Sequence, residues 1–195
     1  MEDRVITLPN SITVARLLLL PLFIWVLLGR HDRFAAAWVL AAMGATDFVD
    51  GYLARHLHQV STVGKVLDPV ADRLLLLGGI AAILVDGAAP AWFCWVVLAR
   101  EGLVAVATVV LGALGARRID VTWFGKAGTF GLMVAFPLFL LGHSSFSWHH
   151  ACEVCAWLAA VPGLVLGLYA LALYVPLARR ALADGRRARE VELAR

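Results

Sequence analysis

The chain has 195 residues, of which 62% are hydrophobic and only 16% are charged, and its formal net charge is +3. A soluble domain carries about a quarter charged residues, so this composition excludes a protein that faces water on all sides. The three cysteines are too few for a disulfide framework. We therefore expect an all-α integral membrane protein.

Six apolar segments follow one another along the chain, each near the roughly 20 residues that a membrane-spanning helix needs. They cover residues 11–29, 34–57, 68–85, 90–114, 123–142 and 154–178. The connections are short and contain Gly, Pro or charged residues, which favours antiparallel neighbours in one bundle. We expect a single domain over residues 1–195: six transmembrane helices, a short interfacial segment before them, and a basic tail over residues 179–195.

The Lys and Arg residues fall mainly on one side of this bundle when the sides are counted alternately. The side of the N-terminus receives Arg4, Arg55, Lys65, Arg117, Arg118, Lys126 and the Arg residues of the tail, whereas the other side receives Arg30 and Arg33. Cytoplasmic loops carry the excess of Lys and Arg in membrane proteins. We expect a multi-pass protein of the cell membrane with both termini in the cytoplasm. The tail either contacts anionic headgroups or is simply solvated.

The first span begins with a polar stripe. Pro9 suits the first turn of a helix, and Asn10, Thr13 and Arg16 then follow at intervals of three residues. Three polar side chains on one face of an apolar helix favour a lined cavity. The alternative for Arg16 is a side chain that extends to the membrane interface.

Four aspartates lie where the second segment ends and the third begins. Asp47 and Asp50 are three residues apart, and Asp68 and Asp72 are four apart. Each pair shares one face of a helix, because residues at these spacings are neighbours on the helix surface. A short loop joins the two antiparallel segments. We therefore expect both pairs at the same depth, facing one another at the cytoplasmic edge of the membrane.

Four carboxylates brought this close repel one another unless they are protonated or neutralised. A divalent metal ion is the natural neutraliser, and oxygen ligands without His or Cys favour Mg²⁺, Mn²⁺ or Ca²⁺ over zinc. Asp68 has a structural alternative, since an aspartate before Pro69 also makes a good helix N-cap. That role leaves the other three aspartates unexplained. We predict that all four bind metal.

Small residues and a cation accompany the aspartates. Gly51 lies within a predicted helix, where glycine costs up to about 1 kcal/mol relative to alanine, and Ala54 follows one turn later. Together they leave the backbone accessible to a flat group. Arg55 adds a fixed cation suited to phosphate. Gly64 lies in the predicted loop before the second pair and is also explained as a turn glycine. This combination indicates a pocket for a metal-bound diphosphate.

The same set resembles the signature of the CDP-alcohol phosphotransferase family, which here reads Asp47-x-x-Asp50-Gly51-x-x-Ala54-Arg55, eight residues, then Gly64-x-x-x-Asp68-x-x-x-Asp72. The match holds at every fixed position, and such a match is rare by chance. The resemblance covers the whole chain, since the family is similar in size and carries this motif on the second and third of six transmembrane helices. It implies an enzyme that transfers a phosphatidyl group from CDP-diacylglycerol to an alcohol and releases CMP.

The resemblance also implies roles for individual residues. Asp47, Asp50 and Asp68 would hold two divalent ions, Mg²⁺ or Mn²⁺, and Asp72 would be the general base beside the second ion. The site for the CDP-lipid would be formed by Gly51, Ala54, Arg55 and Gly64, with the polar stripe Asn10, Thr13 and Arg16. Family members are commonly homodimers, and Gly163-x-x-x-Gly167 offers a surface for close helix packing.

The acceptor alcohol should be held by cations from other spans. The candidates are Arg100, Arg117, Arg118 and Lys126. Arg100 precedes Glu101, so the alternative for this pair is an ion pair within the membrane. Arg73 follows Asp72, but its side chain should point about 100° away around the helix.

The acceptor itself is less clearly indicated. Asn10, Thr13, Arg16, Arg100-Glu101 and Gly125-Lys126 resemble the branch that makes phosphatidylglycerophosphate from glycerol 3-phosphate. That branch typically reads Gly-Lys-x-Lys-Thr-x-x-Gln here, whereas this chain has Gly128 and Leu132 in place of the second Lys and the Gln. Residues 124–133 instead resemble the actinobacterial cardiolipin synthases of the family, whose acceptor is phosphatidylglycerol. We favour phosphatidylglycerol over glycerol 3-phosphate, with inositol-type acceptors third.

Two other classes of protein explain the sequence less completely. A divalent-cation transporter would continue its polar residues across the membrane, but residues 34–44 and 74–85 are almost wholly apolar. A membrane scaffold would leave four clustered acids unexplained. We expect no nucleic-acid partner. His149, Cys152 and Cys155 have the spacing of a soft-metal site, but we favour a simple helix start there.

Overall fold

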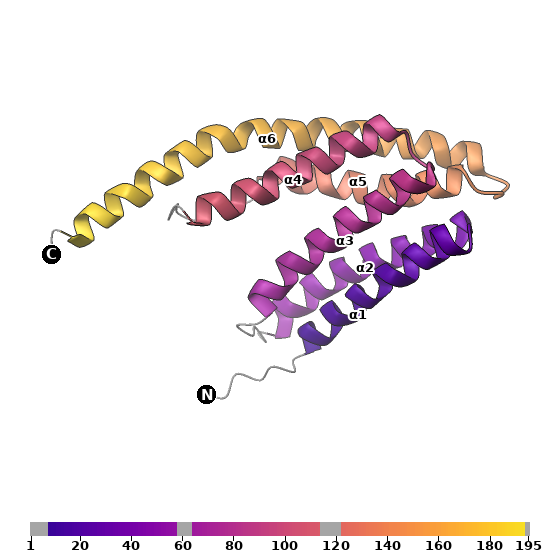
Figure 1. Cartoon of the computed structure of the whole chain (residues 1–195), viewed down its shortest axis with the longest axis horizontal. Helices are drawn as coiled ribbons and strands as arrows, with labels where there is room; N and C mark the ends of the chain where they lie inside the picture. Colours follow the sequence, from indigo (N-terminus) through magenta and orange to yellow (C-terminus); the bar gives the residue numbers. More distant parts are fainter. Residues whose placement is uncertain (1–7, 58–63, 114–121, 194–195) are drawn as a thin grey trace.

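A computed structural model of the chain describes residues 8–57, 64–113 and 122–193, with side chains at residues 15–46, 71, 73–110, 122–174 and 176. All regular structure in this part of the chain is helical (Figure 1). The elements are α1 (Leu8–Ile24), the π-helical turn η1 (Trp25–Gly29), α2 (Arg33–Leu57), α3 (Gly64–Asp86), α4 (Ala91–Ala113), α5 (Trp123–Gly142) and α6 (His149–Leu193). This order confirms the predicted all-α class.

One predicted boundary is wrong. Helix α3 already begins at Gly64, so this glycine does not lie in a loop. Asp68 consequently lies one turn inside the helix and is not its N-cap. The helix can include Pro69 because proline is tolerated near the start of a helix. At the other end of the chain, α6 continues to Leu193. The segment that we expected as a basic tail is therefore helical over most of its length.

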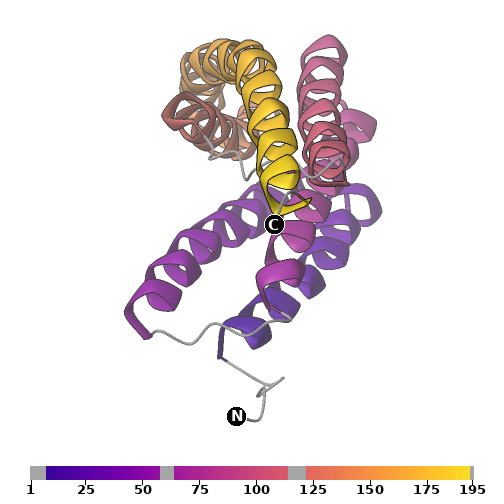
Figure 2. The same cartoon turned by 90° about the vertical axis from the view of Figure 1, so that its left-hand side faces the viewer.

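The helix ends gather at two ends of the bundle. Figure 1 shows the start of α1, the end of α2, the start of α3 and the C-terminus towards the left of the view. We call this the aspartate end, because α2 and α3 carry the four aspartates there. The turns that join α3 to α4 and α5 to α6 lie at the opposite end, which we call the far end. Towards the aspartate end, α2 leans away from α1 and α3 (Figure 2).

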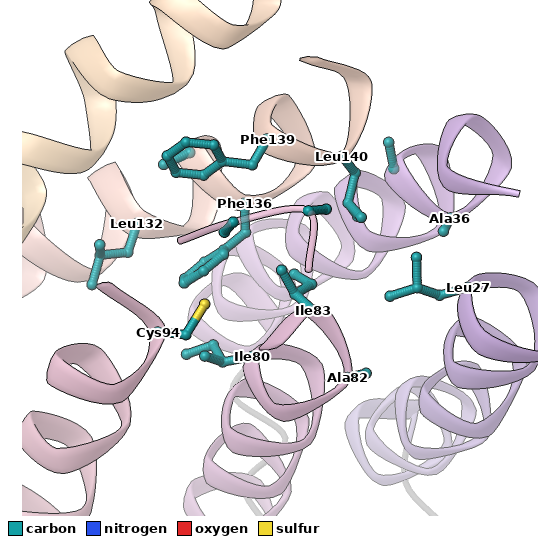
Figure 3. Packing of buried hydrophobic residues seen from close by; sticks show 14 of the residues in the cluster. Leu27, Ala36, Ile80, Ala82, Ile83, Cys94, Leu132, Phe136, Phe139 and Leu140 are labelled. Atoms are coloured by element: carbon teal, nitrogen blue, oxygen red, sulfur yellow. The ribbon is translucent and has the colours of Figure 1, made fainter. Parts of the chain in front are cut away.

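The apolar core lies between the middle of the bundle and its far end. Phe93 of α4 packs against Phe136 and Phe139 of α5 and against Trp157 of α6. Figure 3 shows how Leu27 of η1 and Ile80 and Ile83 of α3 continue this cluster beside Cys94 and Leu132. Such interlocking side chains fix how each helix is rotated about its axis.

One arginine joins three connections at the far end. Nε of Arg33 donates to the carboxylate of Asp86 over 2.8 Å, and its Nη2 donates to the Asp86 carbonyl over 3.1 Å. Nη1 of the same guanidinium donates to the carbonyl of His143 over 3.0 Å. The start of α2, the end of α3 and the end of α5 are thus held by a single side chain.

Helices α5 and α6 pack more extensively than any other pair in the described part of the chain. A Cβ added at Gly128 would lie 2.7 Å from the backbone nitrogen of Gly167, and one added at Gly131 would lie 3.0 Å from Cα of Gly163. The two backbones approach this closely because glycines face each other. The Gly163-x-x-x-Gly167 surface, which we predicted as a dimer contact, is therefore occupied within the chain by α5.

The described helices suit a membrane. Three contain segments long and apolar enough to cross it, namely Ala91–Val110, Trp123–Gly142 and His149–Tyr174, and shorter apolar helices cover Ala15–Gly29 and Arg33–Thr46. Large apolar side chains point outward along α4, including Leu103, Val106 and Val109. Outward apolar faces of this size are expected where lipid replaces water. The protein is thus a membrane protein with several candidate spans.

The glycine contact between α5 and α6 predicts a graded effect of one methyl group. Gly128→Ala should destabilise the protein by about 1–3 kcal/mol, because the new Cβ meets rigid backbone. It should lower the apparent Tm of the purified protein in detergent. Gly102→Ala on α4 is the matched control, since a Cβ there meets nothing within 4 Å. Equal melting temperatures for the two variants would contradict this account of the packing.

Candidate active site

The four predicted metal ligands lie on two continuous helices. Asp47 and Asp50 belong to α2, and Asp68 and Asp72 belong to α3. The helical backbone confirms that each pair shares a helix face, since three and four residues separate their members. Their side chains lie outside the described ones, as do those of Gly51, Ala54, Arg55 and Gly64. Whether the pairs meet must therefore be inferred from the packing nearby.

A contact deeper in the bundle sets the register of α2 against α3. A Cβ added at Gly79 of α3 would lie 3.8 Å from Cδ1 of Leu40 on α2. Seven residues make almost two full turns, so a position seven residues away lies on nearly the same face. Counting seven residues from Leu40 towards the aspartate end gives Asp47, and counting seven from Gly79 in the same direction gives Asp72.

Both steps cover about 10.5 Å along the helix axis, since each residue rises 1.5 Å. Asp47 and Asp72 therefore lie at similar distances from the contact between Leu40 and Gly79, although α2 leans away from α3 towards this end (Figure 2). The juxtaposition of the two aspartate pairs stays a prediction.

Helix α1 carries a buried arginine near this part of α3. A Cβ added at Gly78 of α3 would lie 3.0 Å from Leu20 of α1. Arg16 precedes Leu20 by one turn, and one turn from Gly78 in the same direction leads to Leu74, so Arg16 lies at about the depth of Leu74. Only 4% of Arg16 is exposed. The side chain is covered by protein, which argues against extension to the membrane interface. Asn10 and Thr13 lie on α1, but their side chains are not among those described.

The described charges inside the bundle centre on Glu101 of α4. Its carboxylate accepts hydrogen bonds from Arg73 of α3 and from Arg100 of α4. Arg100 also donates from Nε to the carbonyl of Gly167 on α6 over 3.4 Å. The ion pair that we considered for Arg100 and Glu101 is thus present, and Arg73 is a third member that the sequence did not reveal. The sequence feature that could have indicated this role is a charged residue, Arg73, on an apolar helix without an assigned function.

The start of α5 carries another predicted cation. Thr122 caps the helix by accepting from the backbone nitrogen of Gly125 over 3.2 Å. Lys126 follows in the first turn and is exposed. Gly128 and Leu132 are buried against α6 and the core. The two other predicted acceptor cations, Arg117 and Arg118, lie outside the described residues.

The side chains that the structure describes contain no group of three His, Cys, Asp or Glu residues able to hold a metal ion. This includes His149, Cys152 and Cys155 at the start of α6, where both cysteines are free thiols. Helix α6 begins at His149, in agreement with the expected helix start. The four aspartates remain the candidates for metal binding.

Comparison with known proteins decides the family. The family model described as CDP-alcohol phosphatidyltransferase matches residues 6–175. The chain belongs to this family.

Several relatives cover most of the chain. A cardiolipin synthase (CMP-forming) of Streptomyces coelicolor is 40% identical over 183 residues, which are 91% of this chain and 85% of the relative. A CDP-diacylglycerol–glycerol-3-phosphate 3-phosphatidyltransferase of Escherichia coli is 34% identical over 186 residues, which are 91% and 97% of the two chains. The enzyme of the same name from Bacillus subtilis is 33% identical over 153 residues, which are 71% and 79%.

Membership confirms the resemblance that the aspartate motif indicated. This CDP-alcohol phosphatidyltransferase is an enzyme, so the alternatives of a cation transporter and a scaffold are excluded. The match includes all four aspartates and the cluster around Glu101.

The register of α2 and α3 can be tested by cross-linking the phosphatidyltransferase. In a background with Cys94, Cys152 and Cys155 replaced by Ala, the pair Asp47→Cys and Asp72→Cys should be joined efficiently by a short bifunctional thiol reagent. The reason is that both positions lie two turns from the contact between Leu40 and Gly79, on the helix faces that carry it. The product is detected by mass spectrometry after proteolysis between the two positions.

The control replaces the second position by Ser145→Cys, which lies in the connection between α5 and α6 at the far end. This pair should not react within one chain. Equal cross-linking of both pairs, or of neither pair, would contradict the register.

Proposed function

We propose that the enzyme transfers the phosphatidyl group of CDP-diacylglycerol to a hydroxyl group of phosphatidylglycerol, which forms cardiolipin and CMP. The observation that carries this proposal is that the end of α2 and the start of α3, which carry the four aspartates, lie at the same end of the bundle as the start of α1, which packs against both helices. There the register of the helices would bring four carboxylates close to buried arginines. The similarity to the cardiolipin synthase of Streptomyces coelicolor supports the choice of reaction.

The aspartates fit a pair of divalent cations. Two helices would present oxygen ligands at i, i+3 and i, i+4, and Mg²⁺ and Mn²⁺ prefer such ligands. Asp47, Asp50 and Asp68 would hold the ions, with Asp72 beside the second. The ions would supply neutralisation of the diphosphate and of the charge that develops on the departing CMP.

The protein's own residues would orient the two lipids and move one proton. Asp72 would accept the proton of the acceptor hydroxyl, whose oxygen forms a bond to the phosphorus of the phosphatidyl group while the bond to the CMP oxygen breaks. Gly51, Ala54, Arg55 and Gly64 would shape the site for the CDP group, and Asn10, Thr13 and Arg16 would line it from α1. Positioning and electrostatics supply most of the catalysis in phosphoryl-type transfer.

The packing of α5 supports a lipid acceptor over glycerol 3-phosphate. The branch that uses glycerol 3-phosphate typically has Lys and Gln at positions 128 and 132. This chain has Gly128 and Leu132 there, which are buried against α6 and the core. A lysine at position 128 would collide with the α6 backbone, 2.7 Å from the position of Cβ. The site therefore lacks a cation that would suit a small dianion. The remaining candidate cations for the acceptor are Arg100 and Lys126, with Arg117 and Arg118.

We also propose six membrane spans with both termini in the cytoplasm. The distribution of Lys and Arg favours this orientation. It would bring the aspartate end to the cytoplasm, where CMP is released. A homodimer remains part of the proposal, through a surface other than Gly163-x-x-x-Gly167, which α5 covers.

The reaction is tested by CMP release from purified protein with CDP-diacylglycerol and Mn²⁺ or Mg²⁺. Phosphatidylglycerol should support metal-dependent release, and glycerol 3-phosphate should not. Asp72→Asn should lower kcat at least about 100-fold, because it removes the proposed general base.

Release with glycerol 3-phosphate alone would refute the acceptor and retain the family reaction. Metal-dependent release that is unchanged by Asp72→Asn would refute the role of Asp72.

The orientation is tested by thiol labelling in intact cells, again without the native cysteines. Ser145→Cys at the far end should react with a membrane-impermeant maleimide. Arg186→Cys in α6 should react only after the membrane is permeabilised. The reverse pattern would place the aspartate end outside the cytoplasm and overturn the proposed topology.

A further inference from the structure

Burying the carboxylate of Glu101 inside the bundle costs free energy. The residue lies in the middle of the apolar helix α4, and only 1% of it is exposed. An ionised carboxylate in such surroundings needs charged partners, which here are Arg73 and Arg100. A single ion pair would neutralise Glu101. Among the side chains that the structure describes, two arginines pair with this one carboxylate, so the cluster of Arg73, Arg100 and Glu101 carries one excess positive charge.

The excess charge lies at the depth of the reaction. Arg73 immediately follows Asp72 on α3, and its ion pair with Glu101 brings α4 to the same level. The cluster thus joins the helix that carries the proposed general base to the helix that carries Arg100. A positive charge at this depth is suited to an anionic phosphate group of a substrate.

Arg100 is held from two directions. Glu101 accepts from Nη1, and the carbonyl of Gly167 on α6 accepts from Nε over 3.4 Å. A side chain at position 167 would crowd the guanidinium of Arg100. A Cβ there would lie 3.3 Å from Nε, 3.5 Å from Cζ and 3.5 Å from Nη2 of Arg100.

We propose that Glu101 and Gly167 are positioning residues that hold Arg100 towards the phosphate of the acceptor. Arg73 joins them by fixing α3 against α4. The proposal rests on the proposed function, in which Arg100 contacts the acceptor. It adds that acceptor affinity depends on a carboxylate and a glycine that touch no substrate.

The test compares three variants of the full-length enzyme in detergent, by steady-state CMP release. Glu101→Gln and Gly167→Ala should each raise KM for phosphatidylglycerol about tenfold, the scale of one hydrogen bond to a charged group. KM for CDP-diacylglycerol should change much less. Glu101→Asp, which keeps the charge but shortens the side chain, should recover part of the lost affinity.

Gly102→Ala is the matched control for Gly167→Ala, because the same methyl group enters open space on α4. It should leave both KM values unchanged. The apparent Tm of every variant is measured in parallel. A purely structural role would lower Tm and kcat and would leave KM for the acceptor as it is, which would overturn the proposal.

The same comparison separates this proposal from the proposed function. If the wild-type enzyme uses glycerol 3-phosphate, the acceptor assignment fails, and KM for that anion becomes the measured quantity. A tenfold rise would still support the positioning role. An unchanged KM in Gly167→Ala would overturn it even if Glu101→Gln does not fold.

Discussion

The absence of water inside a membrane is the constraint on which this structure depends. A charged group there must be neutralised by another group of the protein, by a bound ion or by a substrate. Among the described charges, Arg33 pairs with Asp86 at the far end, and Glu101 pairs with both Arg73 and Arg100, which leaves that cluster with one excess positive charge. At the aspartate end, the four carboxylates are ligands of the kind that bound cations neutralise. The chemistry is therefore expected where the charges of the protein do not balance.

The sequence predicted much of the fold and of the candidate site, for clear physical reasons. Apolar length marks helices that face lipid, so the extent of α5 could be predicted to the residue. The aspartates could be predicted because spacing along a helix determines which side chains share a face. Both signals are local, and neither requires knowledge of how helices are rotated against one another.

What could not be predicted depends on that rotation. Arg73 was expected to point away from Asp72, and the sequence did not reveal that its partner is Glu101 on a neighbouring helix. Gly163-x-x-x-Gly167 could serve a second chain or another helix of the same chain, and only the packing shows that α5 occupies it. The start of α3 was misplaced because Pro69 is compatible with either the first helical residue or a later place in the first turns.

The three connections that Arg33 joins also have a mechanical consequence. They fix one end of α2 and α3, and both helices extend from there towards the aspartate end. A tilt of about 5° at the fixed end moves the opposite end of a 23-residue helix by roughly 3 Å. That displacement is comparable to the length of a hydrogen bond. Small differences in the turns at the far end can thus adjust the spacing of the aspartates, so that selection on substrate geometry can act on residues a whole membrane thickness away.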